Sequence, residues 1–304
     1  MVRRTGSRKR ARPPRPPNET ADQALRRHLA DQWAVVARNE KKARGGSVQA
    51  LHDIRVALRR MRTLARTFAK LDEDFLDVLD ERISKVCDRM GDARDLDVWI
   101  ELFGDVVKVG GTEGVSARER RQVLALLRRQ RTRRAAEALD CGMFRRVKKM
   151  IRERLRKRRP KRHKKMPPPE AFAARRMLAV RGLIEERHGK VGNFSKGPAH
   201  DLRRAGRRLR YLSEFFAEGL GRDSVRAGHW ITKAQAALGK VHDCDNALEL
   251  SRDLPSGAAR ATVRKHLRRR RAAQLRKFKV AWRRYADRRL QNAWRARLEA
   301  AARA

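Results

Sequence analysis

Residues 51–68 read LHDIRVALRRMRTLARTF, and residues 199–216 read AHDLRRAGRRLRYLSEFF. In both stretches a histidine is followed by arginines three, seven and ten positions later, and the second pattern lies 148 residues after the first. The same offset relates a second set of residues further along the chain, namely Gly91, Asp95 and Asp97 to Gly239, Asp243 and Asp245. An ungapped register over this distance indicates two copies of one unit of about 150 residues.

Each stretch has the periodicity of an amphipathic helix, with arginines on one face and aliphatic residues on the neighbouring face. The arginine face is the candidate binding surface. It contains His52, Arg55, Arg59, Arg62 and Arg66 with the adjoining Arg60 in the first copy, and His200, Arg203, Arg207 and Arg210 with the adjoining Arg208 in the second. Second-tier candidates are Lys85 and Lys233, which correspond at the same offset. The copies differ where Arg204, Gly206 and Glu214 replace Val56, Leu58 and Arg66, and the glycine predicts looser or closer packing of the second helix.

The arginine face needs compensation for its own charge. Neighbouring guanidiniums about 6 Å apart repel by about 3 kcal/mol at an effective dielectric constant of about 20. The only acidic residue between Val48 and Lys70 is Asp53, so a bound polyanion is the simpler compensation, because guanidinium groups match phosphate oxygens bidentately. A merely solvated arginine face is the alternative interpretation. Recurrence in both copies favours binding, and it is the arginines that support this inference, since His52 and His200 can serve mainly at the helix ends.

The chain as a whole is strongly basic, with 79 Lys and Arg residues against 35 Asp and Glu residues and a formal net charge of +44. Residues 1–20 contain seven basic residues and one glutamate, and residues 156–165 contain eight basic residues. The remainder of the chain still has a net charge of +30. This excess indicates a polyanionic partner for the body of the protein, and not only for its tail.

Composition and periodicity predict an all-α fold, because hydrophobic residues make up 40% of the chain, aromatic residues only 5%, and aliphatic residues recur at helical spacing. Helices are expected at residues 21–43, 48–71, 75–90, 96–107, 116–139, 143–159, 170–188, 198–218, 224–238, 245–252, 258–277 and 278–304. The repeat predicts two homologous antiparallel helical bundles related by an internal pseudo-two-fold axis. We expect a disordered basic tail at 1–20, a first bundle at 21–159, a basic Pro-rich linker at 160–169 and a second bundle at 170–304.

The glycine and aspartate residues shared by the two copies are expected to have structural roles. Each glycine permits a helix break or a close approach between helices. The aspartates that follow can cap the next helix, or pair with an arginine of the binding face and orient it.

The chain shows no catalytic motif. It contains no GK[ST] phosphate loop, no HExxH and no GxSxG, so we expect no catalytic residues, no metal, no cofactor and no enzymatic activity. Three widely spaced cysteines, Cys87, Cys141 and Cys244, predict neither a disulfide framework nor a zinc site and fit a reducing cytoplasm. Without a run of about 18 apolar residues, no membrane insertion is expected.

The paired strings with their following Gly-to-Asp segments resemble the CHAD domain, the conserved histidine α-helical domain, over residues 21–304. This resemblance implies a helical fold with two-fold pseudo-symmetry, a basic cavity between the halves, and binding of inorganic polyphosphate at cytoplasmic polyphosphate granules. The family's histidine corresponds to His52 and His200, and its basic ligands correspond to Arg55, Arg59, Arg62, Arg203, Arg207 and Arg210. The ExExK motif of the CYTH triphosphatase domain that often accompanies CHAD domains is absent, so the chain resembles a stand-alone member.

Nucleic-acid binding is the main alternative, since a phosphate backbone also suits an arginine stripe. Binders of single strands stack bases on exposed aromatic residues, whereas Phe68, Phe215 and Phe216 occupy apolar-face positions. No duplex-reading motif is recognised. An adaptor for an acidic protein, or an enzyme of phosphate metabolism with unrecognised residues, is the remaining alternative.

Overall fold

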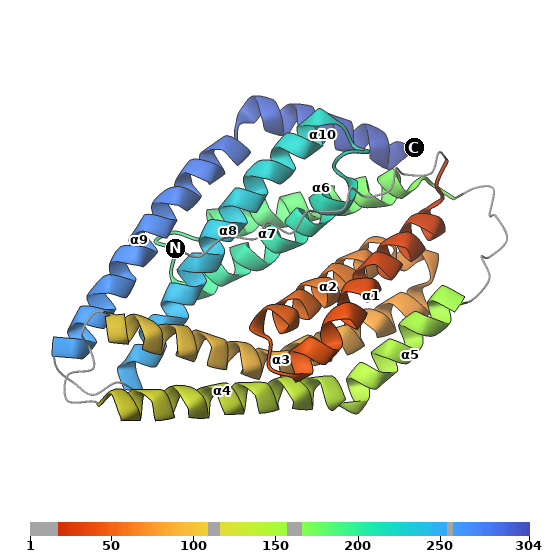
Figure 1. Ribbon diagram of the computed structural model, residues 1–304. Helices are drawn as coiled ribbons and strands as arrows, with labels where there is room; N and C mark the ends of the chain where they lie inside the picture. Colours follow the sequence, from red (N-terminus) through yellow and green to blue (C-terminus); the bar gives the residue numbers. More distant parts are fainter. Residues whose placement is uncertain (1–17, 109–115, 157–165, 254–257) are drawn as a thin grey trace.

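The computed structural model describes residues 18–108, 116–156, 166–253 and 258–304, and the expected disordered tail and basic linker lie largely outside these residues. The described chain is helical throughout, without a strand, which confirms the all-α prediction (Figure 1). In the described ranges the α-helices are α1 (Ala21–Arg44), α2 (Val48–Thr67), α3 (Glu73–Lys108), α4 (Ala117–Asp140), α5 (Gly142–Arg156), α6 (Pro169–Gly189), α7 (Lys196–Phe216), α8 (Arg222–Leu250), α9 (Ala258–Tyr285) and α10 (Arg288–Arg303). Two 3-10 turns, Ala69–Leu71 and Ser251–Asp253, follow α2 and α8.

The helices pack in the same order in the two halves of the chain. In the first half α2 packs on α1 and α3, and α3 packs on α4 and α5; in the second half α7 packs on α6 and α8, and α8 packs on α9 and α10. Figure 1 shows α1–α5 on one side of the molecule and α6–α10 on the other. The halves touch through α1 with α6, α2 with α7 and α3 with α8. The pseudo-two-fold axis itself stays a prediction.

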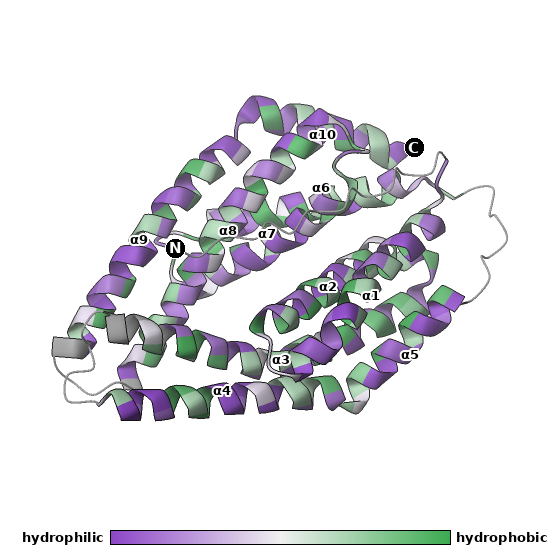
Figure 2. Ribbon diagram, viewed as in Figure 1, coloured by the Kyte–Doolittle hydropathy of each residue, from purple (hydrophilic) through white to green (hydrophobic). Residues whose placement is uncertain are grey.

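A single hydrophobic cluster runs through both halves and joins them. At the junction, the ring of Phe68 lies 5.6 Å from that of Phe172 and 5.9 Å from that of Phe216, measured between centroids. The rest of this core is aliphatic, and Figure 2 shows hydrophobic residues alternating with hydrophilic ones along the helices. Burial of this apolar surface is the main force that holds α2 and α7 in their relative positions.

The helix breaks expected at the two Gly–Asp segments are wrong. Helix α3 continues through Gly91 and α8 continues through Gly239. Glycine costs a helix interior only about 1 kcal/mol relative to alanine, and the buried neighbours Met90 and Leu238 on either helix offset that cost. Neither glycine marks a close approach, because a Cβ atom added at either one would meet nothing within 4 Å.

The break between the last two helices also lies elsewhere than expected. Helix α9 continues past Phe278, which is buried, and ends at Tyr285. The Asp287 side chain then accepts a hydrogen bond of 2.9 Å from the backbone N–H of Leu290 and caps α10. The aspartate cap, and not the aliphatic periodicity, decides where the chain turns.

Two buried or half-buried arginines anchor the starts of the helices that bear the arginine faces. Arg131 of α4 pairs with Asp97 at 2.9 Å and donates to the carbonyl of Gly46, just before α2. In the second half, Arg271 of α9 pairs with Asp245 at 2.6 Å and donates to the carbonyl of Phe194, just before α7. The shared aspartates therefore neither cap helices nor touch the binding-face arginines; they fix the backbone from which α2 and α7 begin.

Gly46 and Phe194 are matched by conformation as well as by position. Both have a positive φ, 90° and 60°, and the offset between them is again 148 residues. Serines follow both residues as the N-caps of α2 and α7, and Ser47 accepts a hydrogen bond from the backbone N–H of Ala50 at 3.2 Å. Both helices are therefore entered through the same kind of turn.

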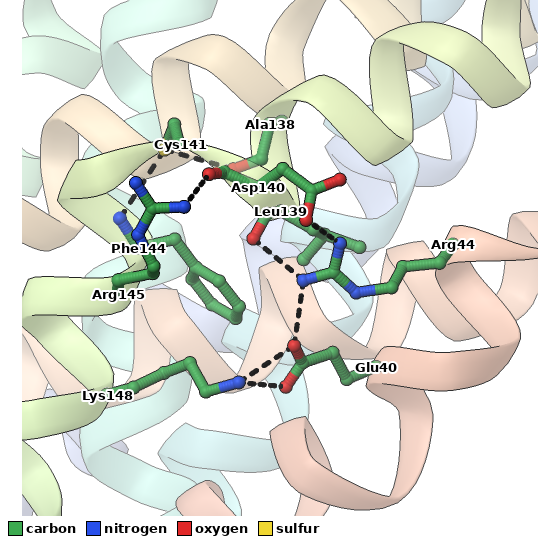
Figure 3. Close-up of polar contacts among 9 residues, drawn as sticks. All are labelled: Glu40, Arg44, Ala138, Leu139, Asp140, Cys141, Phe144, Arg145 and Lys148. Atoms are coloured by element: carbon green, nitrogen blue, oxygen red, sulfur yellow. Dashed lines mark hydrogen bonds and ion pairs between the residues drawn. The ribbon is translucent and has the colours of Figure 1, made fainter.

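Other basic residues in the first half are neutralised by acids. At the junction of α1, α4 and α5, Glu40 accepts from Lys148 at 2.8 Å and from Arg44 at 2.9 Å, and Arg44 also pairs with Asp140 (Figure 3). Burial alone would raise the pKa of Glu40, but the hydrogen bonds from Lys148 and Arg44 lower it. Where cations hold helices together in this protein, carboxylates accompany them.

Candidate functional site

The two arginine faces meet at a pocket between α2, α6 and α7, with a volume of about 100 Å³. Helices from both halves of the chain contribute to its wall. The lining residues are Arg59, Arg62, Thr63 and Arg66 from α2, Arg176 and Val180 from α6, and Arg204, Arg207, Arg208, Tyr211 and Leu212 from α7. Seven of these eleven residues are arginines, and none is acidic.

Only two of the seven pocket arginines have a carboxylate partner. Asp80 of α3 accepts from Arg62 at 2.8 Å and from Arg66 at 2.8 and 2.9 Å. Burial would raise the pKa of Asp80, but these hydrogen bonds lower it. The expectation that no acid compensates the first arginine face is therefore corrected, since an acid from the next helix serves its last two arginines. For the other five, namely Arg59, Arg176, Arg204, Arg207 and Arg208, no acidic partner occurs within the described part of the chain.

Loss of solvation perturbs the arginines deepest between the halves. Burial, followed by the positive charge of neighbouring Arg59, lowers the pKa of Arg55 to about 10, of Arg203 to about 10 and of Arg207 to about 9. Arg55 donates to the backbone carbonyl of Met90, whereas the Nε atom of Arg203 is buried without a hydrogen-bond partner. These guanidiniums are cations held in a poorly solvated place, where an anion would stabilise them strongly.

The histidines contribute little positive charge at neutral pH. Burial and nearby arginines lower the pKa values of His52 and His200. The ring of His200 lies 4.9 Å from that of His242, whose pKa is lowered to about 3 by burial and by Arg203. His52 and His200 are therefore neutral hydrogen-bonding groups beside the arginines, in line with the secondary role expected for them.

Arg60 and Arg210 lie at the contact between α2 and α7, next to the pocket and not in its wall. Arg60 pairs with Glu214 across the halves, and the Nε atom of Arg210 lies 3.3 Å from the same carboxylate. Both guanidiniums lie near the ring of Tyr211, at 5.7 and 4.9 Å from its centroid. Glu214, which replaces the last arginine of the second copy, thus anchors two cations at this contact.

The two second-tier lysines lie outside the pocket. Lys85 is exposed and pairs with Glu81 at 2.5 Å, and Lys233 is exposed above the ring of Trp230 at 4.8 Å. The pocket instead recruits Arg176 and Arg204, which were not among the predicted site residues. The basic pair Arg175–Arg176 could have drawn attention to α6, but only packing shows which of the two faces the pocket.

No metal-binding cluster of three or more His, Cys, Asp or Glu side chains occurs in the ranges that the structure describes. The three cysteines are free. Across the same ranges, no helix combines the length and the apolar character that crossing a membrane requires.

Comparison with known proteins gives one family and two similar structures. A family model described as "CHAD domain" matches residues 27–252. The crystal structure of the CHAD domain from the plant Ricinus communis is similar with a TM-score of 0.56 and 22% identity, covering 92% of each chain. PptA from Streptomyces chartreusis is similar with a TM-score of 0.61 and 17% identity, covering 87% of this chain and 99% of that one. At these identities the likeness shows a common fold alone, and a search of curated proteins finds no match.

Proposed function

The chain belongs to the CHAD domain family, and on that premise we propose that it binds inorganic polyphosphate in the arginine pocket between α2, α6 and α7. CHAD domains are in general non-catalytic binding domains, and the family is linked in general to polyphosphate binding. The proposed role is binding without hydrolysis, which would target the protein to polyphosphate granules or organise them.

One observation supports this function above the others: five guanidiniums without an acidic partner in the described chain surround a single pocket. Elsewhere, as at Glu40, structural cations have carboxylates beside them. Unpaired guanidiniums repel each other, and the pocket lowers their solvation, so the free protein bears a free-energy cost that a polyanion would remove. A phosphate polymer offers closely spaced oxygens to which several arginine forks can bind at once.

The shape of the basic region favours a chain over a single phosphate. The arginine face of α2 runs from His52 to Arg66, about 21 Å at 1.5 Å per residue. The matching face of α7 begins at His200 and reaches the same pocket from the other half. A flexible polymer can follow both faces, whereas one orthophosphate can contact only a few of these arginines.

A double substitution, Arg207→Gln with Arg208→Gln, tests the site. Binding of long-chain polyphosphate, measured by titration calorimetry at moderate salt, should weaken on the order of 100-fold, because two charge-assisted contacts of about 1.5 kcal/mol each are lost. The same variant should unfold at no lower urea concentration than the wild type without ligand, since its pocket contains two fewer unpaired cations. Tighter folding with weaker binding is the signature of residues kept for a ligand.

The matched control is Arg128→Gln with Arg129→Gln, which removes the same charge from exposed positions on α4. This control should change polyphosphate affinity only slightly. Equal losses in the two variants would assign binding to net charge and overturn the pocket. Duplex DNA that displaces polyphosphate from the wild type at equal phosphate concentration would favour the nucleic-acid alternative.

A further inference from the structure

Helix α9 (Ala258–Tyr285) differs in charge from every other helix of the described chain. Of the ten α-helices there, it alone contains no acidic residue. Eight of its basic residues are exposed, with no acidic partner anywhere in the described ranges: Lys265, Arg268, Arg269, Arg276, Lys277, Lys279, Arg283 and Arg284. We call these eight residues the α9 outer face.

The α9 outer face is not needed to hold the helix in place. The apolar side of α9, including Val263, Leu267 and Phe278, is buried in the protein, where the helix packs on α8. Its inward arginines are paired, Arg270 with Glu101 at 3.4 Å and Arg271 with Asp245 at 2.6 Å. The unpaired cations are thus segregated to the side that faces away from the fold, and their mutual repulsion is uncompensated.

The face is extended and lies on the outside of the molecule. From Lys265 to Arg284 it spans about 28 Å at 1.5 Å per residue. Figure 1 shows α9 along the outer edge of the second half, and Figure 2 shows it mainly in the hydrophilic colour. Helix α9 packs on α8, which packs on α7, and no residue of α9 lines the arginine pocket.

We propose that the α9 outer face is a second polyanion site, which binds the phosphate backbone of duplex nucleic acid without reading its sequence. A duplex is a stiff cylinder that cannot enter a pocket of about 100 Å³, but it can lie along a straight row of cations on a convex surface. B-form DNA presents one charge per about 1.7 Å of axis, so a contact of 28 Å faces roughly 16 phosphate charges. A protein with both sites would connect a polyphosphate chain to nucleic acid.

An anionic membrane fits this face less well. Helices that lie in a bilayer interface insert Trp, Phe or Leu side chains from an apolar face. On α9 the apolar side is already buried within the protein, and Val280 is the one large hydrophobic residue of the described helix that is strongly exposed. The outer face therefore offers charge without an inserting surface. It also lies beyond residue 252, where the family match ends, so the family model does not account for it.

A labelled 20-base-pair duplex of mixed sequence tests the proposal by fluorescence polarisation between 50 and 200 mM salt. The variant combines Arg268→Gln, Arg269→Gln, Arg276→Gln and Lys277→Gln, and circular dichroism checks that it stays folded. Its DNA affinity at 100 mM salt should fall at least tenfold, and the slope of log affinity against log salt should decrease by roughly 3 to 4, about 0.9 per cation removed. Its affinity for polyphosphate should remain within about threefold of the wild type, because the pocket is intact.

Two further proteins separate this proposal from the proposed function. A four-charge control on α4, with Arg118, Arg121, Arg128 and Arg129 all changed to Gln, should keep most of the DNA affinity and slope. The pocket variant Arg207→Gln with Arg208→Gln should lose polyphosphate and keep DNA. DNA binding that survives in the α9 variant but fails in the pocket variant overturns the second site. So does an α9 variant that keeps DNA but no longer binds vesicles of one part phosphatidylserine to three parts phosphatidylcholine, which would assign the face to a membrane.

Discussion

Asp80→Asn offers the sharpest test of how the pocket is balanced. Asp80 is the carboxylate that accepts from Arg62 and Arg66, and its side chain is only 17% exposed. Asparagine keeps the shape and one acceptor oxygen but removes the charge. All seven arginines of the pocket then lack a carboxylate among the described residues.

The expected cost can be worked from the geometry. Hydrogen bonds to charged groups contribute about 1.5–3 kcal/mol each when well desolvated. Because the Arg62 and Arg66 side chains are 24% and 30% exposed, solvent screening reduces the combined loss to about 2 kcal/mol. At about 2–4 °C per kcal/mol, the melting temperature should fall by about 4–8 °C. The pKa of Asp80 is lowered in the folded protein, so its contribution is fully present at pH 7 and disappears only as the pH falls below about 4.

Ligand binding should show the opposite sign. Freed from Asp80, two more guanidiniums become available to a polyanion, and affinity for polyphosphate should rise on the order of five- to tenfold, about 1 kcal/mol or more. Saturating polyphosphate should therefore restore much of the lost melting temperature. Thermal unfolding with and without polyphosphate, together with calorimetric titration, measures both quantities at pH 7.

Asp77→Asn is the matched control, because Asp77 is an exposed acid on the same helix. It should alter stability and affinity little. If Asp80→Asn leaves the melting temperature unchanged and does not tighten binding, Asp80 is not a counter-charge of the site, and the reasoning above is refuted.

Three more substitutions probe the supporting structure. The pKa of His242 is lowered to about 3, so wild-type stability should fall by up to about 1.4 kcal/mol per pH unit between about pH 6.5 and that value, and His242→Asn should flatten this slope in urea titrations across pH; parallel slopes would contradict this. Arg131→Met leaves Asp97 buried without its cation and should cost about 3–5 kcal/mol in urea unfolding, while a loss below 1 kcal/mol would deny the anchor. Gly228→Ala would place a Cβ atom 2.7 Å from the Cβ of a serine on α7 and should cost about 1–3 kcal/mol, whereas Gly239→Ala, with open space around the new atom, should be neutral or stabilising; similar effects at both glycines would contradict the packing described.

The helices could be predicted from the sequence because their causes are local. The amphipathic spacing in residues 51–68 and 199–216 repeats over three to four residues, and this alone indicated α2, α7 and their arginine faces. The offset of 148 residues likewise predicted two matching sets of helices. Where local signals competed, as at Gly91, the sequence was ambiguous, because burial on either side of the glycine decides whether a helix continues.

The balance of charge in the site depended on tertiary structure. Asp80 lies 18 positions after Arg62 on another helix, and Arg176 comes from the other half of the chain, so no spacing along the sequence connects them to the arginine face. The sequence by itself determined which residues form two basic, amphipathic helices and that the body of the protein is cationic. Packing decided which of those cations are neutralised and which stay unpaired around the pocket, because pairing requires distances of about 3–4 Å that only the docking of helices distant in the chain creates.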